Sequence, residues 1–164
     1  MKKKPFYLIY IAVFAVLLLL DRFLKNYVAA NMQIGDAIPS KEAFVSIRYT
    51  INTGVSFSLF SGFPDILIIV QGVLFIAVTA AFIVTYRRLW HPVLQTGLVW
   101  IISGGAGNLI DRIMNGYVID YISVGSFPVW NLADMCIVGG CILIGIYLLV
   151  LHDKRADGDE RDSC

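Results

Sequence analysis

The chain has 164 residues, enough for one domain, and 58% of them are hydrophobic while only 15% are charged. Together with a mean hydropathy of +0.75, this composition excludes an ordinary soluble globular domain. A soluble protein of this size and composition would have too few polar groups to cover its surface. The formal net charge of +1 gives no indication of a nucleic-acid partner.

Four stretches that lack Asp, Glu, Lys and Arg predict membrane-spanning helices. In chain order they are Phe6 to Leu20, Ile66 to Tyr86, Val93 to Ile110 and Met135 to Leu151. A helix needs roughly 20 residues to cross a bilayer core of about 30 Å, so the first and fourth stretches must include flanking residues. We therefore predict a mainly α-helical integral membrane protein with four transmembrane helices, in which Asp21 and Asp134 lie close to the membrane.

The first stretch could also belong to a signal peptide. Three lysines at positions 2–4 precede it, and Val28-Ala29-Ala30 resembles a cleavage site. However, Asp21, Arg22 and Lys25 lie between the apolar run and that site. Their charges favour a helix that stays in the protein.

Basic residues at the ends of the predicted helices indicate the orientation in the membrane, because Lys and Arg near span ends mark the cytoplasmic side. The three basic groups are Lys2 to Lys4, Arg87 and Arg88 with His91, and Lys154 and Arg155 with Arg161. All three agree with four spans that leave both termini in the cytoplasm. Residues 1–151 should form one membrane domain, and the charged segment 152–164 should be a disordered cytoplasmic tail.

Both outer loops carry strand patterns. In the first loop, about 31–65, apolar and polar residues alternate from Phe44 to Ile51, and after the turn Asn52-Thr53-Gly54 they alternate again from Val55 to Leu59. We expect a small β-hairpin on the outer membrane surface. The second loop, about 112–130, contains a possible strand from Tyr117 to Val124.

The predicted topology places every polar group that is unusual for its setting at the outer end of the bundle. These residues are Asp21, Lys25, Asn52, Asn108, Asp111, Arg112, Asp120, Asn131 and Asp134. Ionisable residues at a membrane span are costly unless they are paired or used, which makes them functional candidates. The pattern predicts a site at the extracytoplasmic membrane surface.

Simpler explanations exist for several of these residues. Asp21 and Lys25 stand four apart with the acid first, so they could merely neutralise each other. Arg112 could extend its side chain to the membrane surface. Asn131 is a good N-cap, and Asp134 could complete a capping box with it. Capping and catalysis are compatible, because the same geometry points both side chains toward the start of the helix.

The small residues from Ser103 to Gly107 could suggest a nucleotide-binding loop. No predicted strand precedes them and no Lys follows, so we reject that interpretation. Small residues let membrane helices approach closely. We therefore predict close helix packing that leaves room beside Asn108.

The residue types at the outer end narrow the chemistry. Both histidines, His91 and His152, fall on the cytoplasmic side, and Lys25 already has a helical partner, so a serine nucleophile would lack a base. The three cysteines form no outer-loop pair, and no residues have the spacing of a metal site, so we expect no metal and no cofactor. Asp120 and Asp134 remain. Two carboxylates about 3 Å apart share one proton, which is the chemistry of aspartic proteases.

Five motifs, in order and at similar spacing, resemble those of the lipoprotein signal peptidases, also called signal peptidase II. They are Asp21-xxx-Lys25, Asn52 to Phe57, Gly104 to Arg112, Val118 to Tyr121, and Asn131 to Asp134. The resemblance runs from about Phe6 to Leu151. Three positions depart from the family pattern, with Leu24 in place of Thr, Ser56 in place of Ala and Trp130 in place of Phe.

The resemblance implies an aspartic endopeptidase of the bacterial inner membrane that cuts diacylglyceryl-modified prolipoproteins just before the lipidated cysteine. It implies that Asp120 and Asp134 are catalytic. It further implies that Asn52, Asn108, Arg112 and Asn131 surround the substrate, and that Asp21, Lys25 and Asp111 support the site. The expected partners are the lipidated prolipoprotein, membrane lipids and globomycin-type inhibitors, and we expect a monomer.

Two other classes of protein remain as alternatives. In a small transporter or channel subunit, Asp120 and Asp134 would bind protons or cations. Transporters usually place such groups near the bilayer midplane between repeated halves, whereas here they cluster at one face and no repeat is visible. A non-catalytic membrane scaffold would cleave nothing.

Overall fold

The computed structural model describes residues 7–54, 64–89 and 91–151. Its elements in chain order are α1 (Tyr7–Asn31), β1 (Ala37–Ile38), β2 (Val45–Asn52), α2 (Pro64–Arg88), α3 (Pro92–Asn115), β3 (Val118–Val124), α4 (Leu132–Ile146) and a final π-helical turn, η2 (Tyr147–Leu151). The predicted second strand at 55–59, the lysines at 2–4 and the charged tail at 152–164 lie outside the described residues.

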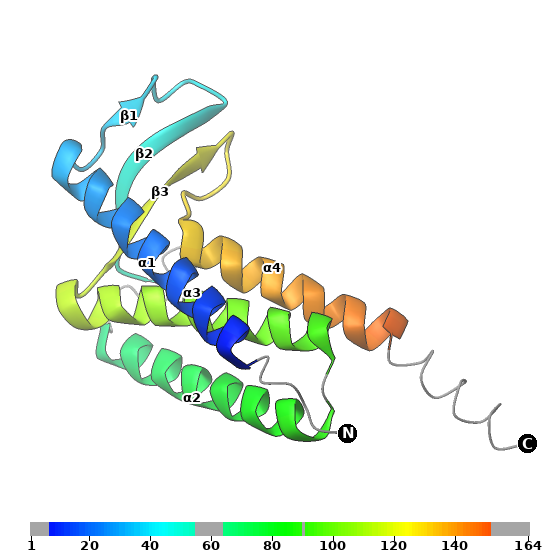
Figure 1. Ribbon diagram of the computed structural model, residues 1–164. Helices are drawn as coiled ribbons and strands as arrows, with labels where there is room; N and C mark the ends of the chain where they lie inside the picture. The colour runs from blue at the N-terminus through cyan, green and yellow to red at the C-terminus, as the bar shows by residue number, and fades with distance from the viewer. Residues whose placement is uncertain (1–6, 55–63, 90, 152–164) are drawn as a thin grey trace, which may run out of the picture.

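The four predicted spans are confirmed. Among the described residues, four helices are long and apolar enough to cross a membrane: Tyr7–Asn31, Asp65–Arg88, Pro92–Asn115 and Leu132–Val150. The start of α1 and the end of α4 lie at the end of the bundle away from the sheet (Figure 1). This arrangement agrees with an even number of crossings, whereas the cytoplasmic location of the two termini stays a prediction.

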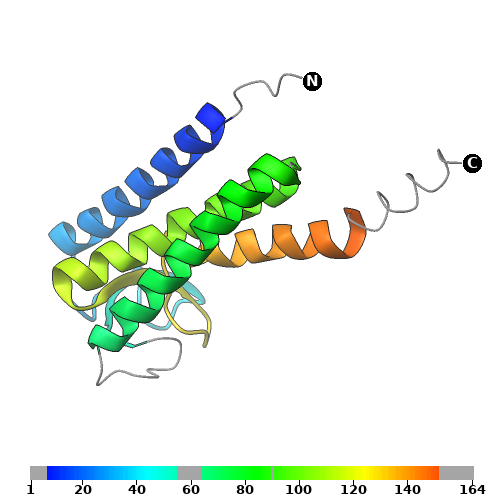
Figure 2. The same ribbon diagram turned by 90° about the horizontal axis from the view of Figure 1, so that it is seen from below.

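Helix α3 is the central helix and packs against α1, α2 and α4 (Figure 2). Its small residues make the contact with α4 possible. A Cβ atom at Gly97 would lie 2.8 Å from the carbonyl oxygen of Gly140, and one at Gly140 would lie 2.5 Å from the carbonyl oxygen of Gly97. The two backbones therefore leave no room for side chains at these positions, as expected for membrane helices that associate through small residues.

The strands form one antiparallel sheet in the order β1-β2-β3. Two of the three predicted strands, 44–51 and 117–124, are confirmed as β2 and β3. Within the described residues, β2 pairs with β1 on one side and with β3 on the other. Thr50 of β2 stands opposite Asp120 of β3, next to an irregularity in the register between Ile47 and Thr50.

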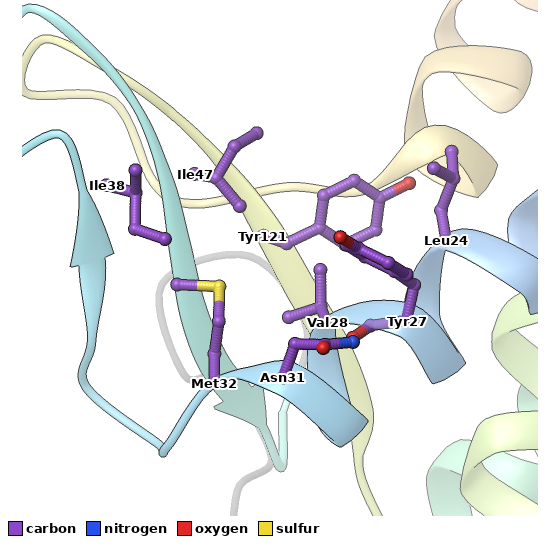
Figure 3. Close-up of a pocket in the computed structure, with 8 residues that line it drawn as sticks. All are labelled: Leu24, Tyr27, Val28, Asn31, Met32, Ile38, Ile47 and Tyr121. Atoms are coloured by element: carbon purple, nitrogen blue, oxygen red, sulfur yellow. The ribbon is translucent and has the colours of Figure 1, made fainter.

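One face of the sheet rests on the last turns of α1. Val28 of α1 forms a buried apolar cluster with Tyr49, Ile119 and Tyr121. Beside this cluster lies an apolar cavity of about 310 Å³, in which Tyr121 lies across from Val28 (Figure 3). Because successive side chains of a strand point to opposite faces, Ile119 and Tyr121 turn toward α1 and Asp120 turns away from it.

Candidate active site

The structure brings all nine predicted site residues into one continuous set of contacts. They come from five elements: Asp21 and Lys25 from α1, Asn52 from β2, Asn108, Asp111 and Arg112 from α3, Asp120 from β3, and Asp134 with its N-cap Asn131 from α4. The set lies where the sheet meets the start of α4 (Figure 1). Each of the five elements contributes different residues to the site.

Asp120 is a buried carboxylate, with only 2% of its surface exposed. Its Oδ1 accepts a hydrogen bond from Asn131 Nδ2 at 2.6 Å, and its Oδ2 accepts one from Asn52 Nδ2 at 3.1 Å. Burial and, next, the nearby charge of Asp134 raise the pKa of Asp120 to about 6, while the two amide donors act in the opposite direction. The Asp120 carboxyl therefore binds a proton more readily than an ordinary aspartate.

Asp134 has a structural role at the start of α4. Asn131 Oδ1 accepts the backbone N–H of Asp134 at 2.9 Å, and Asp134 Oδ2 accepts the backbone N–H of Asn131 at 3.3 Å. The predicted capping box is thus confirmed. The second carboxylate oxygen, Oδ1, accepts a hydrogen bond from Asn108 Nδ2 at 2.7 Å. Capping occupies one oxygen and leaves the other directed into the site.

Asn131 connects the two aspartates. Its side chain is fully buried, and its Nδ2 lies 2.6 Å from Asp120 Oδ1, 3.2 Å from Asn108 Oδ1 and 3.3 Å from the carbonyl oxygen of Ile119. Its Oδ1 is held by the backbone of α4. A single amide side chain therefore fixes the position of β3 relative to α4, and with it the position of Asp120 relative to Asp134.

Lys25 lies at the centre of a buried charged cluster. Its Nζ forms ion pairs with Asp21 at 2.9 Å and with Asp111 at 3.0 Å, and it donates a hydrogen bond to Asn108 Oδ1 at 3.0 Å. Asp111 in turn accepts the backbone N–H of Ile119 at 3.2 Å. The predicted ion pair of Asp21 with Lys25 is present. Through Asp111, the same lysine also connects α1 to α3 and to the backbone of Ile119, the residue before Asp120.

The free N–H groups at the start of α4 all find acceptors. The N–H of Leu132 donates to the hydroxyl of Tyr121 at 3.2 Å, and that of Ala133 donates to Asp21 Oδ1 at 3.0 Å. The remaining two are those of the capping box. Helix starts normally leave such groups unpaired, so residues from α1 and β3 complete the N-terminus of α4.

The glycines of α3 make room for this junction. A Cβ atom at Gly107 would lie 2.5 Å from Asp21 Oδ2, and one at Gly104 would overlap the carbonyl oxygen of Ala133. The prediction of close packing with room beside Asn108 is confirmed. The carboxylate of Asp21 and the first turn of α4 occupy that room.

The expectation that Arg112 could extend to the membrane surface is wrong, because only 6% of this residue is exposed. One of its amino groups donates to the carbonyl oxygen of Gly54 at 2.6 Å, and the other donates to Gln71 Oε1 at 3.1 Å. The N–H of Gly54 donates to Asn52 Oδ1 at 3.0 Å. Arg112 therefore holds the end of β2, and through it Asn52, beside Asp120.

Three residues of the site were missed by the sequence analysis. Arg22 forms an ion pair with Asp111, Gln71 holds Arg112, and Tyr121 accepts the N–H of Leu132. Burial raises the pKa of Tyr121 to about 12, so its hydroxyl stays protonated. A sequence signal existed for Gln71, an amide inside an apolar run, whereas the partner of Arg22 depends on how two helices are rotated against each other.

The arrangement supports acid and base chemistry. Two carboxylates, one of them with a raised pKa, lie within electrostatic reach of each other and accept hydrogen bonds from three amide side chains. A pair in which one carboxyl is protonated and the other is ionised can activate water and polarise a carbonyl at the same time.

Comparison with known proteins gives consistent matches over most of the chain. The family model described as signal peptidase (SPase) II matches residues 13–150. A lipoprotein signal peptidase of Dehalococcoides mccartyi is 40% identical over 153 residues, which cover 89% of this chain and 91% of that protein. One of Mesorhizobium japonicum is 37% identical over 147 residues, which cover 85% of this chain and 82% of that protein.

A solved bacterial membrane enzyme, determined by the in meso method at 2.3 Å resolution, has a similar structure. Its TM-score with this chain is 0.80 at 29% sequence identity, and the match covers 91% of this chain and 92% of that one. The similarity in sequence and the similarity in structure therefore extend over the helices and the sheet alike.

Proposed function

The chain belongs to the signal peptidase II family of membrane aspartic peptidases, and from that premise we propose that it removes signal peptides from diacylglyceryl-modified prolipoproteins, cutting just before the lipidated cysteine. The observation that carries the proposal is the pair of Asp120 and Asp134, which come from β3 and α4 and are connected by Asn131 at the sheet end of a membrane bundle. We assign these two aspartates as the catalytic residues.

The reaction requires one protonated and one ionised aspartate. The ionised aspartate takes a proton from water, the water oxygen bonds to the scissile carbonyl carbon, and the protonated aspartate gives its proton to the carbonyl oxygen. The resulting diol collapses when the first aspartate passes its proton to the amide nitrogen and the C–N bond breaks. One diol hydroxyl returns a proton to the second aspartate, so both side chains regain their starting states without a covalent acyl-enzyme.

The proposed setting of this reaction is the extracytoplasmic face of the bacterial cytoplasmic membrane. A diacylglyceryl group would keep the substrate in the outer leaflet, from which the peptide enters the site laterally. Asn52 lies at the end of β2 beside Asp120, and Arg112 holds the same segment through Gly54. We propose that this segment, together with Asn108 and Asn131, orients the substrate backbone and binds globomycin-type inhibitors in a monomeric enzyme.

Cleavage of purified substrates tests the proposal. The Asp120→Asn and Asp134→Asn variants should each lose cleavage of a lipidated prolipoprotein by at least about 10³-fold, because neither variant can keep the pair of one acid and one base. The unlipidated precursor should stay uncut by the unaltered protein. Each variant must still insert into membranes and elute as a folded species. Full activity in either variant, or equal cleavage of both precursors, contradicts the assignment.

A further inference from the structure

Asp120 and Asp134 form the catalytic dyad of the proposed reaction. Three amide side chains, those of Asn52, Asn108 and Asn131, donate to this dyad, and each has a fixed orientation. Lys25 can only donate, so Asn108 must turn its Oδ1 toward Lys25 and its Nδ2 toward Asp134. In the same way, a backbone N–H holds Asn131 Oδ1, and another holds Asn52 Oδ1. Their Nδ2 groups are therefore left to donate to Asp120. Both aspartates receive only donors, but these donors are not equivalent.

The hydrogen-bonded route from the Lys25 ammonium leads through Asn108 to Asp134, although the charge of Lys25 also lowers the pKa of Asp120. The Asn108 amide that donates to Asp134 is polarised by the buried ammonium group of Lys25. Asp134 also lies in the first turn of α4, where the helix dipole favours a negative charge. Asp134 is partly exposed and thus open to water, whereas Asp120 is buried. The two amides that donate to Asp120 have their own oxygens bound by neutral backbone N–H groups.

We propose that Asp120 carries the proton of the dyad, that Asp134 is the carboxylate that takes a proton from water, and that Lys25 is a positioning residue that fixes this division through Asn108. The inference rests on the proposed function and assigns separate roles within it. The pKa of about 6 for Asp120, raised mainly by burial, agrees with this division.

Other charged or titratable groups surround the dyad from four elements. They are Asp21 and Arg22 on α1, Asp111 and Arg112 on α3, Tyr121 on β3 and Cys136 on α4. None of them forms a hydrogen bond with Asn108 in the described part of the chain, whereas Lys25 does. Asn131 Nδ2 also donates to Asn108 Oδ1, so without Lys25 the Asn108 amide keeps a neutral donor but loses the charged one. Its Nδ2 is then less polarised and stabilises the ionised form of Asp134 less.

The experiment must separate this effect from a loss of folding. Removing Lys25 alone would leave the buried Asp21 without a cation and Asp111 with Arg22 alone, which is strongly destabilising. The double variant Asp21→Asn/Lys25→Met removes one charge of each sign, leaves Asp111 its pair with Arg22, and keeps an acceptor for the N–H of Ala133. The single variant Asp21→Asn is the reference, and Arg22→Met is a control that removes a cation bound to Asp111 but not to Asn108.

The readout is kcat/KM for a lipidated prolipoprotein over a range of pH. The low-pH limb reports ionisation of the base and the high-pH limb reports loss of the proton from the acid. We expect the low-pH limb of the double variant to move up by about one pH unit relative to the reference, which lowers the rate at acidic pH by about tenfold. Arg22→Met should leave the shape of the profile unchanged.

Two results would overturn the inference. If the high-pH limb moves instead, Asp134 carries the proton; if neither limb moves, Lys25 has only a structural role. An infrared measurement covers the case in which the double variant does not fold. The carboxylic acid band that titrates near pH 6 should vanish in Asp120→Asn and persist in Asp134→Asn, because burial is the largest cause of the Asp120 shift. The reverse pattern also contradicts the inference. Activity in both Asn variants would instead refute the proposed function itself.

Discussion

Asp120 illustrates how a functional residue can oppose the stability of the fold that holds it. The carboxyl is buried beside a second carboxylate, and its two amide donors do not offset the loss of water, so its pKa rises to about 6. In the unfolded chain the same group would have a pKa of about 3.9. The folded state therefore binds this proton more tightly than the unfolded state does.

The sign of the resulting pH dependence follows from linkage. The stabilising contribution of Asp120 is fully present below about pH 4 and is lost as the pH rises through about 6. We expect the free energy of unfolding of Asp120→Asn, relative to the unaltered protein, to increase by up to about 3 kcal/mol between pH 4 and pH 8. A pH-independent cost is superimposed, because the new NH2 group faces one of the two amide donors.

Thermal unfolding in detergent at several pH values checks this prediction. The difference between variant and unaltered protein is the relevant quantity, because other groups titrate in both. Glu42→Gln removes an exposed carboxylate from the β1–β2 connection and serves as the control. A pH-independent difference for Asp120→Asn would mean that burial does not set the proton affinity of this residue.

At the scale of elements, the site depends on how closely α3 and α4 pack. Gly104 faces the carbonyl oxygen of Ala133, one residue before Asp134, and no side chain can be accommodated between them. Gly105 is the next residue of α3, and among the described residues only Phe75 lies near it, at 3.9 Å from an added Cβ. The two glycines thus form a matched pair in one turn of one helix.

We expect Gly104→Ala to push the first turn of α4 away from α3. Overpacking of this kind costs about 1–3 kcal/mol, and a displacement of about 1 Å at Asp134 could lower activity by about 10²-fold. Gly105→Ala should keep full activity and gain up to about 1 kcal/mol of stability, since Ala favours the helix. Equal behaviour of the two variants, in cleavage and in thermal unfolding, would show that the contact at Gly104 does not position Asp134.

The elements also show what the sequence could and could not predict. The four helices were predictable because bilayer thickness sets the length of an apolar run, and β2 and β3 because their side chains alternate. The pairing of β2 with β3 was not predicted, because alternation does not identify a partner strand. The same limit applies to Arg22 and Asp111, whose contact depends on helix rotation.

At the scale of the whole molecule, the site lies at the sheet end of the helical bundle. The start of α1 and the end of α4 lie at the opposite end of the bundle (Figure 1). The nine predicted site residues are spread between positions 21 and 134 of the sequence, yet they converge, because a polar group in a membrane protein is stable only where other polar groups meet it. Lys25 and Asn108 show this most directly, being in contact while 83 positions apart.

The orientation of the bundle in the membrane is a prediction that labelling can test. The basic residues Arg87 and Arg88 end α2 at the opposite end from the sheet, and basic residues near span ends mark the cytoplasmic side. The sheet and the dyad should therefore face outward. In a background without the native cysteines, Lys41→Cys on the exposed β1–β2 connection should react with an impermeant maleimide in intact spheroplasts, whereas Leu89→Cys after α2 should react only once the membrane is opened. The reverse labelling would place the dyad in the cytoplasm, where a lipidated substrate anchored in the outer leaflet could not reach it.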